Sequence, residues 1–230
     1  MEAKKISTEQ FSQLLAFTRK HFVEYYDLQV ELADHLANAI EQRWQAQPAL
    51  TFDEALHLEF KKFGIFGFSD IVEQRQNALF KKYYRLVRKE LLSALTFRAV
   101  LIAVLGTLAV YEIVMLLPWS YFVLLLGSLI VSCYRLWQLR RQYKKKLDST
   151  GKKWLLEEII FSCGGLGIML NLPFQLLRYV LQDNIPSGVA AAMALILILS
   201  ILYGYVVLFR MPRHAEAYLQ KAYPEYAMEN

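Results

Sequence analysis

Cysteine is scarce in this chain, with two among 230 residues. Cys133 and Cys163 both fall inside apolar runs, where a cysteine usually serves as a small packing residue. We therefore expect no disulfide framework of the kind that stabilises small secreted domains. The stretch from Met1 to Lys20 also lacks the apolar segment of a secretory signal, so we expect the first membrane helix to direct its own insertion.

Catalytic motifs are absent as well. The sequence contains no HExxH zinc motif, no glycine-rich phosphate loop and no recognisable Ser/His/Asp pattern. Its histidines are scattered and form no obvious ligand set: His21, His35, His57 and His214. From these absences we expect a protein that is not an enzyme and that holds no cofactor or metal ion.

Long apolar runs are the dominant feature. Hydrophobic residues make up 56% of the chain and concentrate after Leu91. Two runs stand back to back around Pro118, and about 20 apolar residues suffice for a helix to cross a bilayer. The junction between the two runs, Leu117-Pro118-Trp119-Ser120, is too short for any connection other than a tight hairpin. The sequence predicts four membrane-spanning helices, over about residues 95–117, 119–137, 154–174 and 188–209.

Basic residues predict the orientation of these helices. They crowd before the first helix, between the second and third, and after the fourth, whereas the opposite turns hold Arg178 alone. Because Lys and Arg stay on the cytoplasmic side, we expect both termini in the cytoplasm and the chain in a bacterial inner membrane. Two spans with a peripheral second hairpin are the alternative. The net charge of +5 lies beside the apolar runs, so we do not expect nucleic-acid binding.

Residues 1–90 have the mixed charge of a soluble domain, and their sequence pattern predicts helices. Capping-box patterns at Ser7 and Thr51 predict helix starts, and Asp27 is a candidate cap for a helix over 28–45. We expect the first helix over 8–25, Gly64 as the left-handed end of the third, and a fourth from Ser69 without a stop before Leu91. The predicted core of this module is Leu32, Leu36, Ile40, Leu56, Phe60 and Phe63.

The resulting prediction is an all-α chain in three parts. A small cytoplasmic helical bundle occupies residues 1–90, a four-helix transmembrane bundle occupies 91–210, and a polar cytoplasmic tail occupies 211–230. Glu157 and Glu158 fall in the first turn of the third membrane helix, where carboxylates are favourable, and we interpret them as interfacial charges.

Two groups in the module are candidate contact sites. Asp27, Glu31 and His35 lie four apart on one helix face, with Asp34 alongside. Such spacing can bind a metal, but no second pair supplies the remaining ligands, so we favour contacts that close the bundle or engage a partner. The second group clusters around two glycines and predicts either a core plug or a hydrophobic knob offered to a partner or to the membrane surface: Phe63, Ile65, Phe66 and Phe68.

A family pattern is recognisable in the segment Glu31-Leu32-x-x-His35-Leu36, followed by Glu54-Ala55 and Phe63-Gly64. It resembles the permease-prefix or HAAS-type helical module that precedes permeases and membrane sensors in bacteria, over about residues 27–75. A basic residue is usual just before Glu31, where this chain has Leu28, Gln29 and Val30, and Gln47-Pro48-Ala49 replaces a usual glycine. The resemblance implies a cytoplasmic helical module attached to a membrane domain, and it does not imply an enzyme.

A basic, aromatic segment precedes the first membrane helix. Its Lys and Arg side chains are expected to meet anionic lipid head groups while their stems stay in apolar surroundings. The residues concerned are Lys81, Lys82, Arg85, Arg88 and Lys89.

Glu112 is the one acidic residue inside an apolar run, and a charge there normally faces protein or water. Counting along the helices places Asn171 at a similar depth and Gln175 and Arg178 nearer the outer surface. We therefore expect Glu112 to engage Arg178, with Asn171 or Gln175 completing a polar set. This set is interpreted either as a lock between helices or as a ligand, ion or protonation site.

Two functions are consistent with these patterns. The first is a non-enzymatic inner-membrane regulatory, sensory or accessory subunit whose cytoplasmic module engages a protein partner or a second copy. The alternative is a small transporter or transporter subunit with a polar site near Glu112 and Arg178. A transporter requires a polar stripe on more than one helix, and the polar residues lie mainly on the third, which favours the first function.

Overall fold

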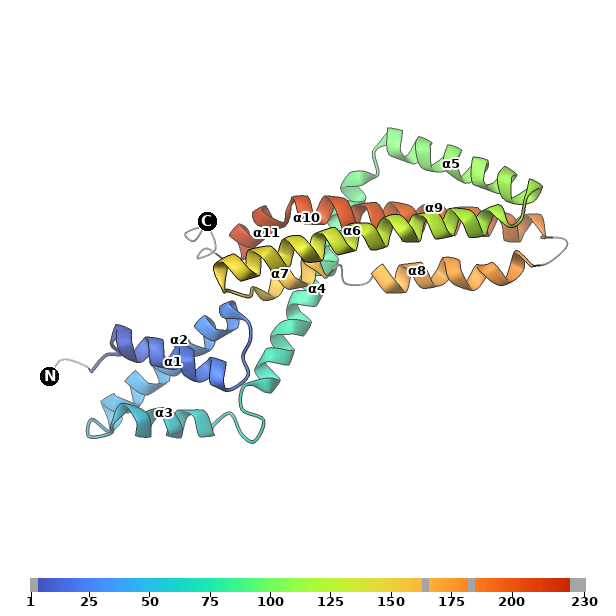
Figure 1. Cartoon of the computed structure of the whole chain (residues 1–230). Coiled ribbons are helices and arrows are strands. Elements are labelled where there is room, and N and C mark those ends of the chain that lie inside the picture. Colours follow the sequence, from blue (N-terminus) through green and yellow to red (C-terminus); the bar gives the residue numbers. More distant parts are fainter. Residues whose placement is uncertain (1–3, 163–165, 182–184, 224–230) are drawn as a thin grey trace. The chain divides into compact units, whose positions relative to one another are not determined.

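The computed structural model describes residues 4–162, 166–181 and 185–223, and within these ranges the regular elements are helices without a strand (Figure 1). The all-α prediction is confirmed. The chain divides into two compact units. The first is Met1–Lys81 with Thr150–Leu156, and the second is Lys82–Ser149 with Glu157–Asn230. Helix α4, Ser69–Ala94, contributes residues to both units.

The first unit begins with α1 (Thr8–Lys20), α2 (Tyr26–Ala46) and α3 (Phe52–Lys61). The capping boxes at Ser7 and Thr51 are confirmed, because each hydroxyl accepts from the N3 amide and the N3 side chain accepts from the cap amide. Helix α1 ends at Lys20 and not at Tyr25. Phe22 has φ +65°, a left-handed backbone that a right-handed helix cannot contain.

Asp27 does not cap α2, contrary to the prediction. The cap position is Tyr25, which makes no side-chain capping bond, and Asp27 lies in the first turn. Its Oδ1 instead accepts a hydrogen bond from the amide of Leu155, at 3.3 Å. The Tyr26 amide donates to the carbonyl of Lys153 at 2.7 Å. The segment 150–156 is thus tied to α2 by backbone groups, which periodicity does not reveal.

The core of the first unit lies between α1, α2 and α3. Four of the six predicted core residues are buried, and Phe60 and Phe63 are half-buried. Trp154, from the segment 150–156, is also buried, with its ring 5.4 Å from that of Tyr26. The other large buried side chains of this core include Leu14, Trp44 and Phe68.

The second unit contains three described helices that are long and apolar enough to cross a membrane: α5 (Phe97–Leu116), α6 (Ser120–Thr150), and Ser187–Arg213. The last combines α9 (Ser187–Tyr205), the π-helical turn η2 (Val206–Arg210) and α10 (Met211–Arg213). Helix α4 does not run into α5. It ends at Ala94, and the Thr96 hydroxyl accepts from the amide of Ala99 to start a new helix.

Helix α6 extends well beyond the predicted end at Trp137. The basic residues expected in a loop, from Arg135 to Lys146, lie on this helix, so that expectation was wrong. Lys and Arg are good helix formers, and no proline or glycine interrupts the run before Gly151, whose φ is +65°. Cys133, expected as a packing residue, is a free and exposed thiol on α6. Cys163 lies outside the described residues.

The predicted third span, 154–174, is described as two helical parts. It comprises α7 (Leu155–Phe161) and α8 (Leu166–Gln175), with residues 163–165 outside the described ranges, and neither reaches the length of a span. Pro173 lies inside α8, and a 3-10 turn, η1 (Leu176–Tyr179), follows it. Helix α11 (Ala215–Ala222) lies within the predicted tail, of which residues 224–230 are not described.

The hydrophobic core of the second unit gathers where α5 ends and α6 begins. Val114 and Tyr121, on either side of the hairpin, share this core with Ile185 and Ala190 at the start of the third apolar helix. Leu176 and Tyr179 of η1 pack against it, and the Tyr121 hydroxyl donates to the carbonyl of Pro173 at 3.0 Å. Midway along α6, Arg135 Nε donates to the carbonyl of Leu208 at 3.3 Å. From the hairpin to this contact, α6 and the third apolar helix therefore run in the same direction.

Candidate functional site

The predicted contact residues of the module lie on one helix but do not form one site. Glu31 pairs with Arg75 of α4, and Asp34 accepts from the amide of Asn38 at 3.3 Å. His35 is exposed, with its ring 6.3 Å from that of Phe63. Asp27 is engaged with the Leu155 amide. Within the described residues no three His, Cys, Asp or Glu side chains gather to hold a metal.

The aromatic cluster around the two glycines separates into a buried and an exposed half. Phe68 is 1% exposed, and its ring lies 4.9 Å from that of Phe63 and 5.0 Å from that of Phe60 in edge-on contacts. Ile65 is 99% exposed and Phe66 is 70% exposed. One loop thus holds a buried aromatic ring, as the predicted core plug requires, next to an exposed apolar tip.

Two glycines fix this loop. The Gly67 amide donates to the carbonyl of Gly64 at 3.4 Å, which places Ile65 and Phe66 at the tip of the turn. Gly64 has φ +74°, confirming its predicted left-handed conformation, and Gly67 has φ +54°. A Cβ on Gly67 would lie 3.2 Å from Cζ of Phe60, so a larger residue would have to displace that ring slightly, in addition to adopting the positive φ.

Charges anchor the helix that leads into the loop. Glu59 at the end of α3 is 4% exposed and lies between Arg43 and Lys62, at 2.5 and 2.6 Å. Burial by itself would raise the pKa of the Glu59 carboxyl, but the hydrogen bonds from Lys62 and Arg43 outweigh burial and lower that pKa. The carboxylate therefore stays ionised and holds α3 to α2 directly before the exposed tip.

The structure brings together one pair of the predicted intramembrane residues. Gln175 Nε2 donates to Oδ1 of Asn171 at 2.6 Å on α8. Arg178 donates to the hydroxyl of Tyr179 at 2.9 Å and lies over that ring. Glu112 is exposed on α5 and forms no ion pair with Arg178 within the described ranges.

A carboxylate cluster that the sequence did not single out lies where α4 ends. Glu90 is 8% exposed, and its Oε2 lies 3.2 Å from Nε of Arg210. Its Oε1 lies 3.2 Å from Nδ1 of His214 and accepts from the Tyr218 hydroxyl at 2.5 Å. Arg210 also donates to the Ser93 hydroxyl at 3.2 Å. One carboxylate thus joins α4 to η2, α10 and α11.

The electrostatics of this cluster favour the ionised carboxylate. Burial by itself would raise the pKa of Glu90, but the hydrogen bond from Tyr218 and the charges of His214 and Arg210 lower it below its ordinary value. Conversely, burial and the bond to Glu90 raise the pKa of the Tyr218 hydroxyl. Tyr218 therefore remains a donor, and Glu90 remains its acceptor, at neutral pH.

The predicted interfacial acid Glu157 is buried. It lies 2.9 Å from Nζ of Lys146 on α6, and its side chain is 3% exposed. The sequence could have indicated the buried Glu90 by register. Glu90 continues a buried stripe with Tyr83, Val87 and Ala94, while the basic residues Lys81, Arg85, Arg88 and Lys89 of α4 are exposed and Lys82 is half-buried.

Comparisons with known proteins supply no further evidence, since no protein-family model, no curated protein and no solved structure matches the chain.

Proposed function

We propose that this chain is a non-enzymatic bacterial inner-membrane protein, a regulatory, sensory or accessory subunit whose cytoplasmic helical module engages a protein partner. The observation that carries the proposal is the exposed Ile65-Phe66 tip beside the buried Phe68. The resemblance of residues 27–75 to a permease-prefix or HAAS-type module agrees with this assignment. The three apolar helices indicate a membrane protein.

Contacts within the second unit support four crossings. Helix α6 leaves the hairpin end and contacts Leu208 through Arg135, midway along its length, while the third apolar helix starts at the hairpin core with Ile185. The chain between Thr150 and Ser187 must therefore return to the hairpin end. We propose that α7, α8 and η1 make this return crossing, with the Asn171–Gln175 bond satisfying polar groups within it.

The charge distribution supports a cytoplasmic location for both termini. Glu90 and Arg210 bring the end of α4 to the end of the third apolar helix, and the basic half of α6 lies at that same end of the unit. Lys and Arg concentrate on the cytoplasmic side of membrane proteins. The exposed basic side chains of α4 then meet anionic lipid head groups.

The tip of the module is suited to a protein groove. Ile65 and Phe66 expose apolar side chains on a turn fixed by two glycines, so little conformational entropy is lost when a partner covers them. Aromatic anchors on rigid supports are typical of binding hot spots. A transporter is supported less well, because the described helices join Asn171 to Gln175 but do not extend this pair into a polar path.

A photocrosslinking amino acid at Phe66 tests the proposal in intact cells. We expect a discrete protein adduct from position 66 and none from a matched control at Phe22, which is equally apolar and 91% exposed in the same unit. Crosslinking to lipid alone, or equal adducts from both positions, would contradict a protein partner at this loop.

Cysteine labelling tests the orientation. In a variant without Cys133 and Cys163, we expect Trp119→Cys at the hairpin to react with an impermeant reagent outside the cell. Ser149→Cys, at the exposed end of α6, should react after lysis alone. External labelling at position 149 would contradict the proposed topology.

A further inference from the structure

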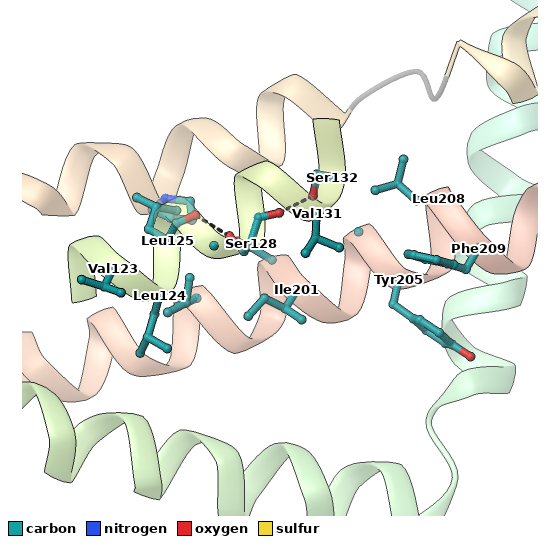
Figure 2. A pocket seen from close by; sticks show the side chains of 15 residues that line it. Val123, Leu124, Leu125, Ser128, Val131, Ser132, Ile201, Tyr205, Leu208 and Phe209 are labelled. Atoms are coloured by element: carbon teal, nitrogen blue, oxygen red, sulfur yellow. Dashed lines mark hydrogen bonds between the residues drawn. The ribbon is translucent and has the colours of Figure 1, made fainter. Parts of the chain in front are cut away.

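An apolar groove runs between α6 and the third apolar helix in the second unit (Figure 2). Its volume is about 450 Å³, within the range of small-molecule sites. Helix α6 contributes Ser128, Val131 and Ser132 to one wall, while Ile201, Tyr205 and Phe209 form the other. Val123 and Leu124 lie at one end, and the rings of Tyr205 and Phe209 lie towards the other, stacked at 5.8 Å.

The serine hydroxyl groups in this groove donate to carbonyls of their own helices. Ser128 donates to the carbonyl of Leu125 and Ser132 to that of Ser128, both at 2.8 Å, as the dashed lines in Figure 2 show. Ser200 donates to the carbonyl of Ile196 at 2.8 Å. The groove therefore offers an occupant mainly hydrocarbon, which suits an alkyl chain better than a polar solute.

A guanidinium group lies at the Phe209 end. The Cζ atom of Arg135 is 5.1 Å from the centre of the Phe209 ring. Its Nε donates to Leu208, which lines the groove, and its Nη1 donates to Gln138 at 3.0 Å. Within the described part of the chain Nη2 makes no hydrogen bond, so two N–H groups remain for an anion.

We propose that the groove binds one acyl chain of an anionic phospholipid, with the phosphate at Arg135. The stretch of α6 from Val123 to Ser132 rises about 14 Å, which matches half of the roughly 30 Å hydrocarbon core of a bilayer. The positive charge at one end and hydrocarbon along the rest complement a lipid of the leaflet that faces the basic end of α6. The inference rests on the membrane placement proposed above and is independent of the partner at Phe66.

Native mass spectrometry of the full-length protein tests this site, with palmitoyl-oleoyl phosphatidylglycerol and phosphatidylcholine as probes. We expect the protein to retain phosphatidylglycerol about tenfold better, which corresponds to about 1.4 kcal/mol. Arg135→Gln should abolish this preference. The matched control Arg140→Gln removes an exposed charge from the same helix and should keep it.

Gly127→Leu tests the groove itself. Gly127 lines the groove and a Cβ there meets no atom within 4 Å, so we expect the added leucine to occupy the groove and reduce retention of both lipids at least fivefold, about 1 kcal/mol. If this variant loses its helical circular dichroism, it is misfolded, and the comparison of Arg135→Gln with Arg140→Gln tests the lipid site by itself.

Three results would overturn the site. They are equal retention of both lipids by the unaltered protein, an equal loss in Arg135→Gln and Arg140→Gln, or a dimer that Gly127→Leu dissociates while lipid retention stays unchanged. The last result would assign the groove to a second copy. Release of the chain from membranes by alkali would refute the membrane placement as well, whereas failure of crosslinking at position 66 would leave the lipid site intact.

Discussion

The Nε atom of Arg210 lies 3.2 Å from Oε2 of Glu90 and joins the end of the third apolar helix to the end of α4. Neither residue belongs to a recognisable motif, and each lies next to an apolar run. Because His214 and Tyr218 meet the same carboxylate, Glu90 is the connection between α4 and the segment that follows the third apolar helix.

Replacing Glu90 by alanine should destabilise the second unit. The change leaves Arg210 and the Tyr218 hydroxyl without their acceptor. We expect a loss of about 2–3 kcal/mol, less than the 3–5 kcal/mol of a fully buried pair, because Arg210 and His214 are partly exposed. Thermal unfolding of the detergent-solubilised protein measures the loss. Glu216→Ala, an exposed acid of α11, is the control, and an equal effect of both variants would contradict this role for Glu90.

The stabilisation by Glu90 should depend on pH in the acidic range. Its pKa in the folded chain lies below the ordinary 4.5, so the unfolded chain binds more protons in this window. The contribution is therefore complete above about pH 5 and is lost as the pH falls through the folded pKa. The difference in unfolding temperature between the unaltered protein and Glu90→Gln should shrink between pH 5 and about pH 3. A constant difference would show that the charge of Glu90 does not carry the effect.

Truncation of Phe68 should lower the stability of the first unit, whereas truncation of Phe66 should leave it nearly unchanged. Phe68→Ala removes a buried ring and should cost about 3–5 kcal/mol, whereas Phe66→Ala at an exposed tip should stay within about 0.5 kcal/mol. Amide hydrogen exchange of α1, α2 and α3 in the full-length protein measures both. Loss of protection in Phe66→Ala would mean that the tip belongs to the core and not to a partner site.

Exchanging the two charges of the Lys146–Glu157 pair should preserve part of its contribution to stability. Glu157→Lys places two cations together at a buried position and should cost at least about 3 kcal/mol. Adding Lys146→Glu restores opposite charges, so the double variant should regain part of that loss in thermal unfolding. Asp148→Lys, at an exposed site on α6, is the control. Additive effects of the two changes would refute the pairing.

Local chemistry explains how much of the fold could be predicted. The capping boxes at Ser7 and Thr51, the left-handed Gly64 and the hairpin at Pro118 each depend on a few neighbouring residues, and the structure contains all of them. Errors arose at two helix ends. The C-terminus of α1 is set by the positive φ of Phe22, which its residue type does not indicate, and that of α6 by Gly151, which lies well beyond the end of the apolar run.

By itself, the sequence determined that this protein is helical and has apolar helices long enough to cross a membrane, because hydrophobic periodicity and run length act within one segment. The tertiary structure decided which polar groups meet. Glu90 with Arg210, Glu157 with Lys146, and the exposure of Phe66 beside the buried Phe68 depend on contacts between segments far apart in the chain or on the fold of one loop. Periodicity gives the face of a helix on which a residue lies, but the partner of that face is set by how the helices pack.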